Sequence, residues 1–207
     1  MYKIFFKPLF DYSVALIMTI ICAPIIILVS IILYFSNNRK PFFFQIRPGK
    51  NEKKFTIIKF KTMNDKVDES GNLLPDTYRF TSIGKIIRKT SIDELPQLFN
   101  ILKGDMSLIG PRPLIPAYLP YYKTNEKKRH TVKPGITGLA QVNGRNTINW
   151  DTRLQFDADY VDNLSFKMDF NILIKTIYNV ITSKDVAVDS TKTETYLNIE
   201  RKDQNIK

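Results

Sequence analysis

A long uncharged stretch near the N-terminus restricts most strongly what this chain can fold into. No charged residue occurs from Tyr12 to Asn38, and the centre of the stretch, from Val14 to Phe35, is almost wholly apolar. A helix over this centre would be about 33 Å long, close to the thickness of the hydrocarbon core of a bilayer. A signal peptide fits poorly, because the run is long and no small-residue cleavage site accompanies it. Pro24 lies near the middle and removes one backbone hydrogen bond, so the stretch predicts a membrane helix that bends.

The charges that flank this stretch are positive on both sides. Lys3 and Lys7 precede it, and Arg39 and Lys40 follow it. Positive residues mark the cytoplasmic side of a membrane segment, so both ends indicate the same side. The residues alone leave two topologies open. One is a re-entrant helix that bends at Pro24 and returns to the side from which it entered, and the other is an ordinary kinked transmembrane helix.

Composition limits the partners and the kinds of site. The 207 residues suffice for one domain with a core plus an appendage. Lys and Arg number 31 against 20 Asp and Glu, and the net charge of +11 indicates nucleic acid, an anionic membrane or a phosphorylated substrate as a partner. Cys22 is the single cysteine and His130 the single histidine, so an internal disulfide is excluded and a zinc site of thiolates and imidazoles is disfavoured.

Two short β-prone runs after the apolar stretch predict a hairpin close to the membrane. They span residues 41–47 and 55–60, and the Pro-Gly-Lys-Asn-Glu segment between them at 48–52 has strong turn chemistry. The polar segment 64–76 is expected to be an exposed loop. A short basic helix is expected at 82–89, and it leads directly into a pair of carboxylates.

That pair, Asp93 and Glu94, precedes a helical run with apolar residues at the i, i+3, i+4, i+7 spacing. Ser91 could cap the helix in a capping box with Glu94, or Asp93 could cap it with Pro96 in the first turn, and the second interpretation is favoured. Both interpretations place the carboxylates at a helix N-terminus, where free N–H groups and the helix dipole favour anions. We expect the pair to stay ionised and to meet a phosphoryl group. The alternative is that Asp93 is only a cap.

Two further motifs are dense in glycine and proline. Pro111 and Pro113 restrict the backbone on both sides of Arg112, which could hold the guanidinium rigidly for bidentate phosphate recognition. The alternative is a proline-rich turn with a solvated Arg112, and the residues alone leave both open. Residues 133–145 contain three glycines and a proline, and we interpret them as a loop whose backbone can approach a ligand closely. This loop lacks the ending of a P-loop, and it does not match the dinucleotide fingerprint.

The remaining segments are interpreted from their polarity. Residues 114–122 are apolar and aromatic and are assigned to an interface between protein and lipid, and the basic cluster at 125–130 to a solvated face or a lipid headgroup contact. An amphipathic segment from Trp150 to Leu164 is followed by an apolar helix at 168–181. After Ser183 the chain is polar, and it is expected to be a frayed tail.

Taken together, these motifs resemble those of the bacterial sugar transferases, the small monotopic phosphoglycosyl transferases. The resemblance covers roughly residues 1–183, and it is closest to the members that transfer a phospho-bacillosamine derivative in bacterial protein N-glycosylation. Motif order and spacing are retained over most of this range. The matching segments are Lys59-Phe60-Lys61-Thr62-Met63, Asp93-Glu94-Leu95-Pro96-Gln97-Leu98, Lys103-Gly104-Asp105-Met106-Ser107, Gly110-Pro111-Arg112-Pro113, Pro134-Gly135-Ile136-Thr137-Gly138 and Gln141-Val142-Asn143-Gly144-Arg145.

The resemblance implies a reaction in which a UDP-sugar gives its sugar 1-phosphate to a membrane polyprenyl phosphate, such as undecaprenyl phosphate, and releases UMP. It implies that Asp93 attacks the β-phosphate to form an aspartyl-phosphosugar intermediate, and that Glu94 assists through the required Mg²⁺ or through proton handling. The two carboxylates are the expected Mg²⁺ ligands. Phosphoryl transfer needs charge neutralisation and alignment above all, which agrees with such a site. The expected phosphate and substrate contacts are Lys59, Arg88, Arg112 and Arg145, together with Asp157, which matches the family pattern without an assigned role.

The resemblance also implies an architecture. The fold class is α+β, mainly helical, with an N-terminal re-entrant membrane helix, a small β-hairpin and interfacial amphipathic helices around a cytoplasmic active site. The expected division is a membrane helix at 1–38, a catalytic domain at 39–183 on the cytoplasmic face of the bacterial inner membrane, and a mobile tail at 184–207. Ala23 departs from close relatives, which often have Ser before the proline, so the resemblance implies the position of the bend but not its angle.

Three alternatives remain. A membrane-anchored basic module that binds nucleic acid would explain the charge, but no recognisable nucleic-acid motif is present, so no nucleic acid is expected as a partner. A non-catalytic scaffold is disfavoured because Asp93, Glu94 and Arg112 are all present. The third is the same chemistry on UDP-glucose or UDP-galactose for capsule or exopolysaccharide, although the compact size disfavours the larger hexose-type relatives. The sequence does not give the sugar, the downstream glycan or the oligomeric state.

Overall fold

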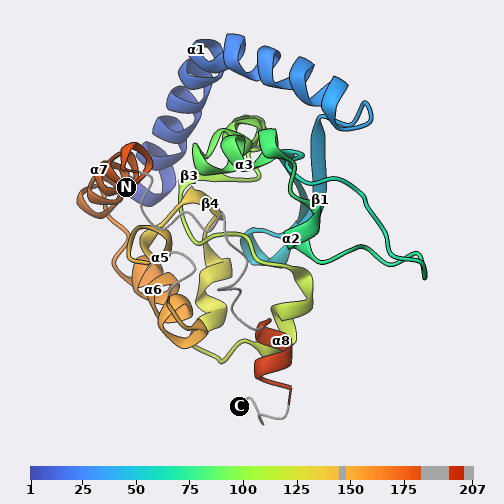
Figure 1. Ribbon diagram of the computed structural model, residues 1–207. Coiled ribbons are helices and arrows are strands. Elements are labelled where there is room, and N and C mark those ends of the chain that lie inside the picture. The colour runs from blue at the N-terminus through green and yellow to red at the C-terminus, as the bar shows by residue number, and fades with distance from the viewer. Residues whose placement is uncertain (145–147, 183–195, 203–207) are drawn as a thin grey trace.

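The computed structural model describes residues 1–144, 148–182 and 196–202. A short π-helical turn, η1 (Tyr2–Phe6), leads into the long helix α1 (Lys7–Ser36), which contains Pro24. Figure 1 shows that α1 changes direction sharply between its two halves and arches over the rest of the molecule. A proline inside a helix removes a backbone hydrogen bond and crowds the preceding turn, which accounts for a bend at this point. The predicted bent helix is therefore confirmed.

Both ends of α1 pack against the remainder of the chain. Near its start, Ala15 lies fully buried in a cluster with Ile101 and Met106. Just beyond its end, the Asn37 side-chain amide donates to the carbonyl of Lys61 at 3.0 Å. A straight span would carry one of these ends across the bilayer, so contacts at both ends fit the re-entrant topology and not the simple span.

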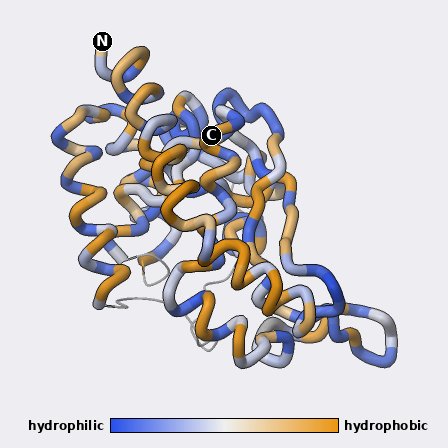
Figure 2. The backbone as a smooth tube through the Cα atoms, turned by 90° about the horizontal axis from the view of Figure 1, so that it is seen from above, coloured by the Kyte–Doolittle hydropathy of each residue, from blue (hydrophilic) through white to orange (hydrophobic). Residues whose placement is uncertain are grey.

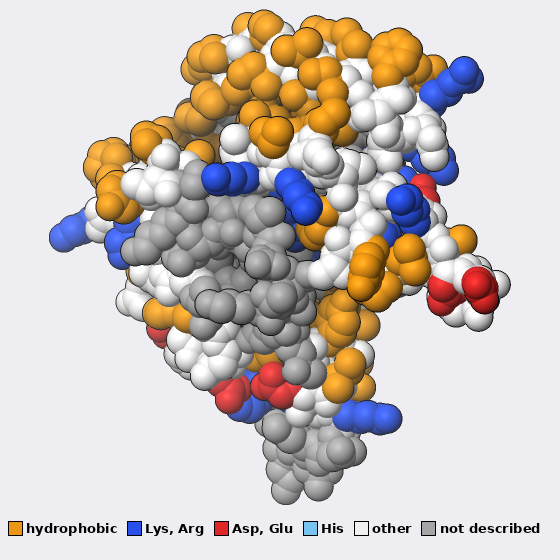
Figure 3. Space-filling view, in the orientation of Figure 1, with side chains coloured by type: hydrophobic (Ala, Val, Ile, Leu, Met, Phe, Trp, Pro, Cys, Tyr) orange, Lys and Arg blue, Asp and Glu red, His pale blue; other side chains and the backbone are white. Residues whose placement is uncertain are grey.

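The outer surface of α1 is apolar and exposed. The helix is long and apolar enough to cross a membrane, and 22% of its most hydrophobic window is buried inside the structure. A core helix of a soluble protein would be mostly buried, and contiguous exposed apolar surface of this extent usually marks a membrane or partner contact. Figure 3 shows this apolar surface covering the arch, and the hydropathy colouring of Figure 2 follows the same hydrophobic stretch from the N-terminus. Membrane association is thus supported by the fold.

The predicted hairpin is confirmed. Strands β1 (Phe42–Pro48) and β2 (Lys54–Phe60) pair antiparallel, and the single turn η2 (Lys50–Glu52) connects them. The free edge of β2 is satisfied by one side chain: Asn100 accepts from Ile58 N at 3.0 Å and donates to Thr56 O at 2.7 Å. Because Asn100 lies on the helix α4 (Leu98–Leu102), these bonds fix the hairpin next to the segment that carries the carboxylate pair.

The segment between the hairpin and the carboxylates also follows the predictions. A largely exposed loop projects from the body in Figures 1 and 2, and it ends at the short helix α2 (Asp76–Arg79). Helix α3 (Ser82–Lys89) then begins at Thr81, whose hydroxyl accepts from Gly84 N at 2.9 Å. A side chain at Gly84 would collide with the Thr62 carbonyl, since a Cβ there would lie 2.0 Å from it. The close approach of α3 to the end of β2 therefore requires this glycine.

The glycine-rich segment at 133–145 packs against its own chain. Strands β3 (Ser107–Ile109) and β4 (Gly135–Thr137) form a parallel pair that was not predicted. A Cβ on Gly135 would lie 2.1 Å from Gly110 N, and one on Gly138 would lie 2.2 Å from Gly110 O. These glycines allow two backbone segments to approach each other closely. The interpretation that they open the backbone to a ligand is therefore wrong for Gly135 and Gly138.

The remaining described helices lie below the hairpin and α3 in Figure 1, except for α7, which lies beside the start of α1. They are η4 (Pro116–Tyr121), η5 (Glu126–Thr131), α5 (Leu139–Val142), α6 (Trp150–Asp162), α7 (Phe166–Ile181) and α8 (Leu197–Glu200). Asn149 caps α6 by accepting from Thr152 N, and Ser165 caps α7 by accepting from Met168 N. The expected α+β, mainly helical fold is confirmed, including the amphipathic helix α6 and the apolar helix α7.

Three interpretations from polarity are wrong for several of the residues that they cover. Tyr118 and Tyr122, assigned to a lipid interface, are buried in a cluster with Trp150, Leu154 and Leu197. In the segment 125–130, assigned to a solvated face or a headgroup contact, Glu126, Arg129 and His130 are all buried.

The third concerns the expected polar tail at 184–207, and it is wrong for the described residues 196–202; the rest of the tail lies outside the described residues. Within it, the described residues 196–202 form α8 with its flanking residues, Leu197 is fully buried, and the Arg201 guanidinium donates twice to Glu126 at 2.7 and 2.8 Å. The sequence analysis missed these contacts because they join residues that are far apart in the chain, and local composition does not reveal such pairs.

Candidate active site

The carboxylate pair lies in the first turn of a 3₁₀ segment, η3 (Ile92–Gln97), which continues into α4. Ser91 occupies the N-cap in a left-handed conformation at φ 58° and makes no side-chain capping bond. Neither predicted cap is therefore present: Ser91 and Glu94 form no capping box, and Asp93 lies in the first turn of η3 and not at its N-cap. The placement of both carboxylates at a helix N-terminus is confirmed. The favoured interpretation, which placed Pro96 in the first turn, is wrong: η3 begins after Ser91, and Pro96 lies inside it.

One carboxylate oxygen of Glu94 accepts hydrogen bonds from two cationic side chains. Its Oε1 accepts from Lys59 Nζ at 2.6 Å and from Arg112 Nη2 at 2.7 Å. Burial disfavours the ionised carboxylate, but the charges of Arg112 and Lys59 outweigh it and hold the pKa of Glu94 well below its usual range. Burial lowers the pKa of Lys59 against the opposing effect of Glu94, and Glu94 raises the pKa of Arg112. Glu94 is therefore a fixed anion at the centre of the site.

Asp93 lies beside this ion pair without sharing in it. Among the described residues, no hydrogen bond or ion pair reaches its carboxylate. Burial and the charge of Glu94 raise the pKa of Asp93 to about 6, against the opposing charges of Lys59, Arg112 and Arg88. The expectation that Asp93 stays ionised holds at neutral pH, but its reactivity differs from that of its neighbour. A desolvated carboxylate without a partner is available as a nucleophile or as a metal ligand.

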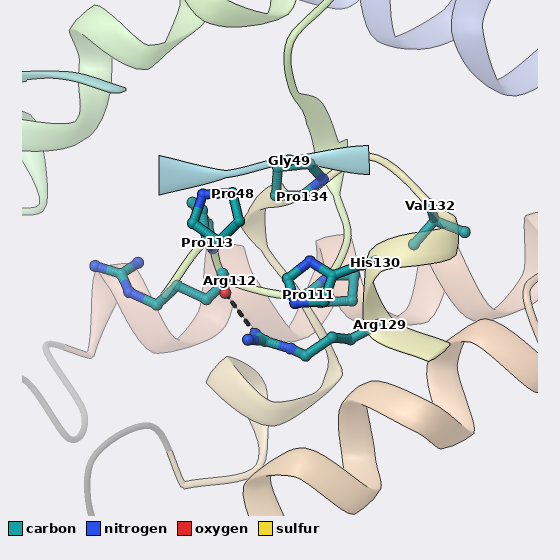
Figure 4. A pocket seen from close by; sticks show the side chains of 9 residues that line it. All are labelled: Pro48, Gly49, Pro111, Arg112, Pro113, Arg129, His130, Val132 and Pro134. Carbon is teal, nitrogen blue, oxygen red and sulfur yellow. Dashed lines mark hydrogen bonds between the residues drawn. The ribbon is translucent and has the colours of Figure 1, made fainter. Parts of the chain in front are cut away.

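The backbone of Arg112 is fixed by a hydrogen bond from a buried arginine. Its carbonyl accepts from Arg129 Nη2 at 2.6 Å. Figure 4 shows the two flanking prolines around this peptide and the Arg112 side chain extending away from them. Within the described residues the guanidinium makes a single ion pair, to Glu94, and 43% of the side chain is exposed. The predicted rigid backbone at Arg112 is thus present, and the remaining N–H groups are accessible to an anion.

The residue that holds Arg112 is itself fixed by Asp157. Arg129 Nη2 lies 2.9 Å from Asp157 Oδ2, and Arg129 Nη1 donates to the Tyr122 hydroxyl at 2.7 Å. Asp157 on α6 is 2% exposed, so it lies behind the site and is connected to it through Arg129. Sequence reasoning missed Arg129, because it lies in a basic cluster whose composition resembles that of a solvated face.

Of the other two predicted phosphate contacts, the structure describes Arg88 but not Arg145. Arg88, in the last turn of α3, lies with its guanidinium 5.0 Å from the ring centroid of Phe80, and its charge acts on Asp93. Arg145 lies outside the described residues. The structure brings together Lys59, Asp93, Glu94, Arg112 and Arg88, which come from β2, η3, α3 and the segment after β3.

The donor set suits a magnesium ion shared with a substrate. The described residues contain no group of three or more His, Cys, Asp or Glu side chains that could hold a metal by themselves. Mg²⁺ is commonly bound by one or two carboxylates together with substrate phosphates and water, and Asp93 and Glu94 provide two hard oxygen donors side by side. These residues therefore fit an ion that arrives with a phosphorylated substrate.

Comparison with known proteins agrees with the site. The model of the bacterial sugar transferase family matches residues 2–183. The uncharacterized sugar transferase EpsL of Bacillus subtilis is 51% identical over 181 residues, which cover 87% of this chain and 89% of EpsL. The exopolysaccharide production protein ExoY of Rhizobium meliloti is 36% identical over 195 residues, which cover 86% of each chain. The undecaprenyl-phosphate galactose phosphotransferase of Salmonella typhimurium is 38% identical over 203 residues, which cover 88% of this chain and 42% of the relative.

Proposed function

Because this chain belongs to the bacterial sugar transferase family, we propose that it moves a sugar 1-phosphate from a UDP-sugar to undecaprenyl phosphate and releases UMP. The name of the Salmonella relative, an undecaprenyl-phosphate galactose phosphotransferase, supports this reaction class. The products would be a polyprenyl diphosphate sugar and UMP, which makes this the first membrane step in the assembly of a glycoconjugate.

One observation carries the proposal: two adjacent carboxylates in one turn differ in their surroundings. Glu94 is paired with Lys59 and Arg112, whereas Asp93 has no ion pair among the described residues and a pKa raised to about 6. A site in which one carboxylate is fixed and its neighbour is unpaired suits covalent catalysis, because the unpaired group can attack while its neighbour orients the cations.

The proposed reaction has two steps. First, a carboxylate oxygen of Asp93 attacks the β-phosphorus of the UDP-sugar, the bond from that phosphorus to the bridging oxygen breaks, and UMP leaves with the bonding electrons. Second, a phosphate oxygen of the lipid attacks the same phosphorus, the bond to Asp93 breaks, and the carboxylate is regenerated. Lys59, Arg88 and Arg112 would offset the charge that develops on the transferred group and the leaving group.

Magnesium is part of the proposal. Asp93 and Glu94 are the residues that would hold it, and when bound it would neutralise phosphate charge and orient the diphosphate. The chain's own contribution is to keep Glu94 ionised through Lys59 and Arg112, so that this one of the two carboxylate donors persists at low pH.

The decisive experiment separates the two steps. The purified protein is mixed with UDP-sugar and Mg²⁺ without lipid acceptor, and UMP is measured after rapid quenching. We expect about one UMP per site and a sugar phosphate on the peptide containing Asp93, which polyprenyl phosphate then discharges. If UMP appears only when both substrates are present and no adduct is found, transfer is direct, and Asp93 would be a metal ligand or a general base.

The sugar is a separate question that the same assay answers. The sequence does not give the sugar: the narrower resemblance is to members that transfer a phospho-bacillosamine derivative, whereas the name of the Salmonella relative favours UDP-galactose. A panel of UDP-galactose, UDP-glucose, their N-acetylated amino sugars and a bacillosamine derivative, with UMP release as the readout, distinguishes these substrates.

We further propose that the domain lies on the cytoplasmic face of the membrane. Positive residues flank both ends of the apolar helix, and both ends pack on the same domain. Single cysteines at the exposed positions Lys3 and Lys40, in a Cys22→Ala background, should both react with an impermeant reagent only from the cytoplasmic side. Labelling of either one from outside would contradict this placement.

A further inference from the structure

Arg47 lies on the same face of the hairpin as Lys59. Paired residues in an antiparallel ladder share a face, and side chains alternate along each strand. Lys59 pairs with Phe43 and Arg47 pairs with Phe55, so Phe43 and Arg47, four residues apart on β1, both project on the Lys59 side. Lys59 reaches Glu94, and Glu94 reaches Arg112. Arg47 therefore extends the cationic side of the active site along the hairpin.

The charge that acts most strongly on Arg47 is that of another cation, Arg112. Burial and the neighbouring charge of Arg112 together lower the pKa of Arg47 to about 10. Its Nη2 donates to the neutral amide oxygen of Gln45, and its buried Nε has no hydrogen-bond partner among the described residues. A partly buried guanidinium beside a like charge is unfavourable unless an anion compensates for it.

Two other buried arginines of this chain differ from Arg47 because each has a carboxylate partner. Arg129 pairs with Asp157, and Arg201 pairs with Glu126. Each of these side chains is at most 2% exposed and each has a carboxylate partner within 3 Å. Arg47 has no carboxylate partner among the described residues. The contrast indicates that Arg47 is not a structural ion pair but a group whose counter-ion comes from outside the chain.

We propose that Arg47, together with Arg112, binds a second phosphate group of the reactants, beside the phosphate that reacts at Asp93. The proposal rests on the function proposed above and assigns one more residue to its substrate site. Arg112 is already occupied on one N–H by Glu94, so its free donors and those of Arg47 can together surround one phosphate. That phosphate belongs either to the nucleotide diphosphate or to the lipid phosphate, since both are anions of the same chemistry.

Binding measurements on the full-length protein in lipid nanodiscs test this assignment independently of catalytic turnover. The variant is Arg47→Gln. The matched control is Lys54→Gln, which removes the same charge from an exposed position on the neighbouring strand, next to the residue that pairs with Arg47. Each protein is titrated with UDP and, separately, with undecaprenyl phosphate, and the melting temperature without ligand is recorded. Arg47→Lys is added as the variant that keeps the charge.

We expect Arg47→Gln to weaken one of the two ligands by about tenfold or more, because a charge-assisted contact is lost. Loss for UDP alone assigns the nucleotide diphosphate, loss for undecaprenyl phosphate alone assigns the lipid phosphate, and loss for both assigns a contact shared by the two. The melting temperature without ligand should not fall, since a repulsive charge has been removed, and Arg47→Lys should recover part of the affinity.

Two results would overturn the assignment. Affinities within about twofold of the parent for both ligands, as expected for Lys54→Gln, would show that Arg47 contacts neither phosphate. A clear fall in melting temperature for both Arg47 variants would make it a structural residue. If the parent protein binds neither UDP nor undecaprenyl phosphate, the proposed function fails as well, so the two failures can be told apart.

Discussion

The chain has a buried pair of carboxylates at the start of the membrane helix and a half-buried pair at the active site, and the two pairs differ in how completely they are hydrogen-bonded. At the membrane helix, Asp169 accepts from Lys7 at 2.8 Å, from Tyr2 at 2.6 Å and from Tyr160 at 2.8 Å. Its companion Asp11 accepts from Ser107 at 2.6 Å. At the active site, Glu94 is similarly satisfied by two cations, but no ion pair or hydrogen bond within the described residues reaches Asp93.

The difference separates an anchor from a reactive site. A buried polar network in which every member has partners fixes the elements that contribute to it, and here it ties the start of α1 to α7 and to β3. A buried carboxylate left without partners keeps its free energy high, and in a cluster of cations it is available for a ligand. The comparison predicts that mutations in the two places will have different effects: loss of folding at the anchor and loss of chemistry at the site.

The largest effect is expected for Asp93→Asn. This change keeps the shape of the side chain and removes the proposed nucleophile, so UMP release should fall by about three orders of magnitude or more. The melting temperature should not fall, because a raised pKa means that the ionised side chain is disfavoured in the fold. Asp162→Asn, at an exposed surface pair with Lys128, is the control and should leave the rate unchanged. Retention of a tenth of the activity would rule out covalent catalysis by Asp93.

At the anchor, Lys7→Met should destabilise the fold. The substitution leaves Asp169 and Asp11 buried without their cation, and breaking a buried ion pair in this way typically costs about 3–5 kcal/mol. Thermal unfolding in detergent or nanodiscs measures the effect, and molecules that remain folded should still form the adduct on Asp93. Lys3→Met, at an exposed position of the same segment, should change stability by less than about 0.5 kcal/mol. Equal melting temperatures for the two variants would contradict the role of the anchor.

A smaller loss is expected for Arg112→Lys. The charge remains, but the planar fork that can bind Glu94 and a phosphate together is lost, so the rate should fall by about tenfold to a hundredfold. Steady-state UMP release measures it, with Arg39→Lys at an exposed position as the control. An Arg112→Lys enzyme that works nearly as well as the parent would reduce Arg112 to a surface charge.

The smallest effect is the pH dependence of the first step. Asp93 must be ionised to attack, and its pKa is raised to about 6, so adduct formation should be nearly constant above pH 7 and fall by about tenfold between pH 7 and pH 5. Glu94 contributes nothing in this range, because its cations hold its pKa well below it.

Glu94→Gln sharpens the comparison. It removes the negative charge that raises the pKa of Asp93 and frees Lys59 and Arg112 to act on Asp93, so the profile of any residual activity should move to lower pH. A profile that stays at the same pH, or moves upward, would mean that another group controls the step.

Much of the local structure could be predicted from the sequence. The hairpin, α3, the bend in α1 and the placement of Asp93 and Glu94 at a helix start all depend on neighbouring residues: turn chemistry, a capping threonine and a proline within an apolar run. The parallel pair β3 and β4 was missed, because each strand has only three residues and their pairing depends on the close packing of glycines that lie far apart in the chain.

What the sequence determined by itself is the chemistry that the chain carries: an apolar helix interrupted by Pro24, two adjacent carboxylates and an arginine held between prolines. Only the tertiary structure decided how charge is distributed among these groups. Lys59 and Arg112 lie 35 and 18 residues from Glu94, yet both reach the same oxygen of that residue and none of Asp93. Electrostatic pairing depends on distance and burial in three dimensions, and a linear sequence contains neither, so which carboxylate is fixed and which is left reactive was settled by the fold.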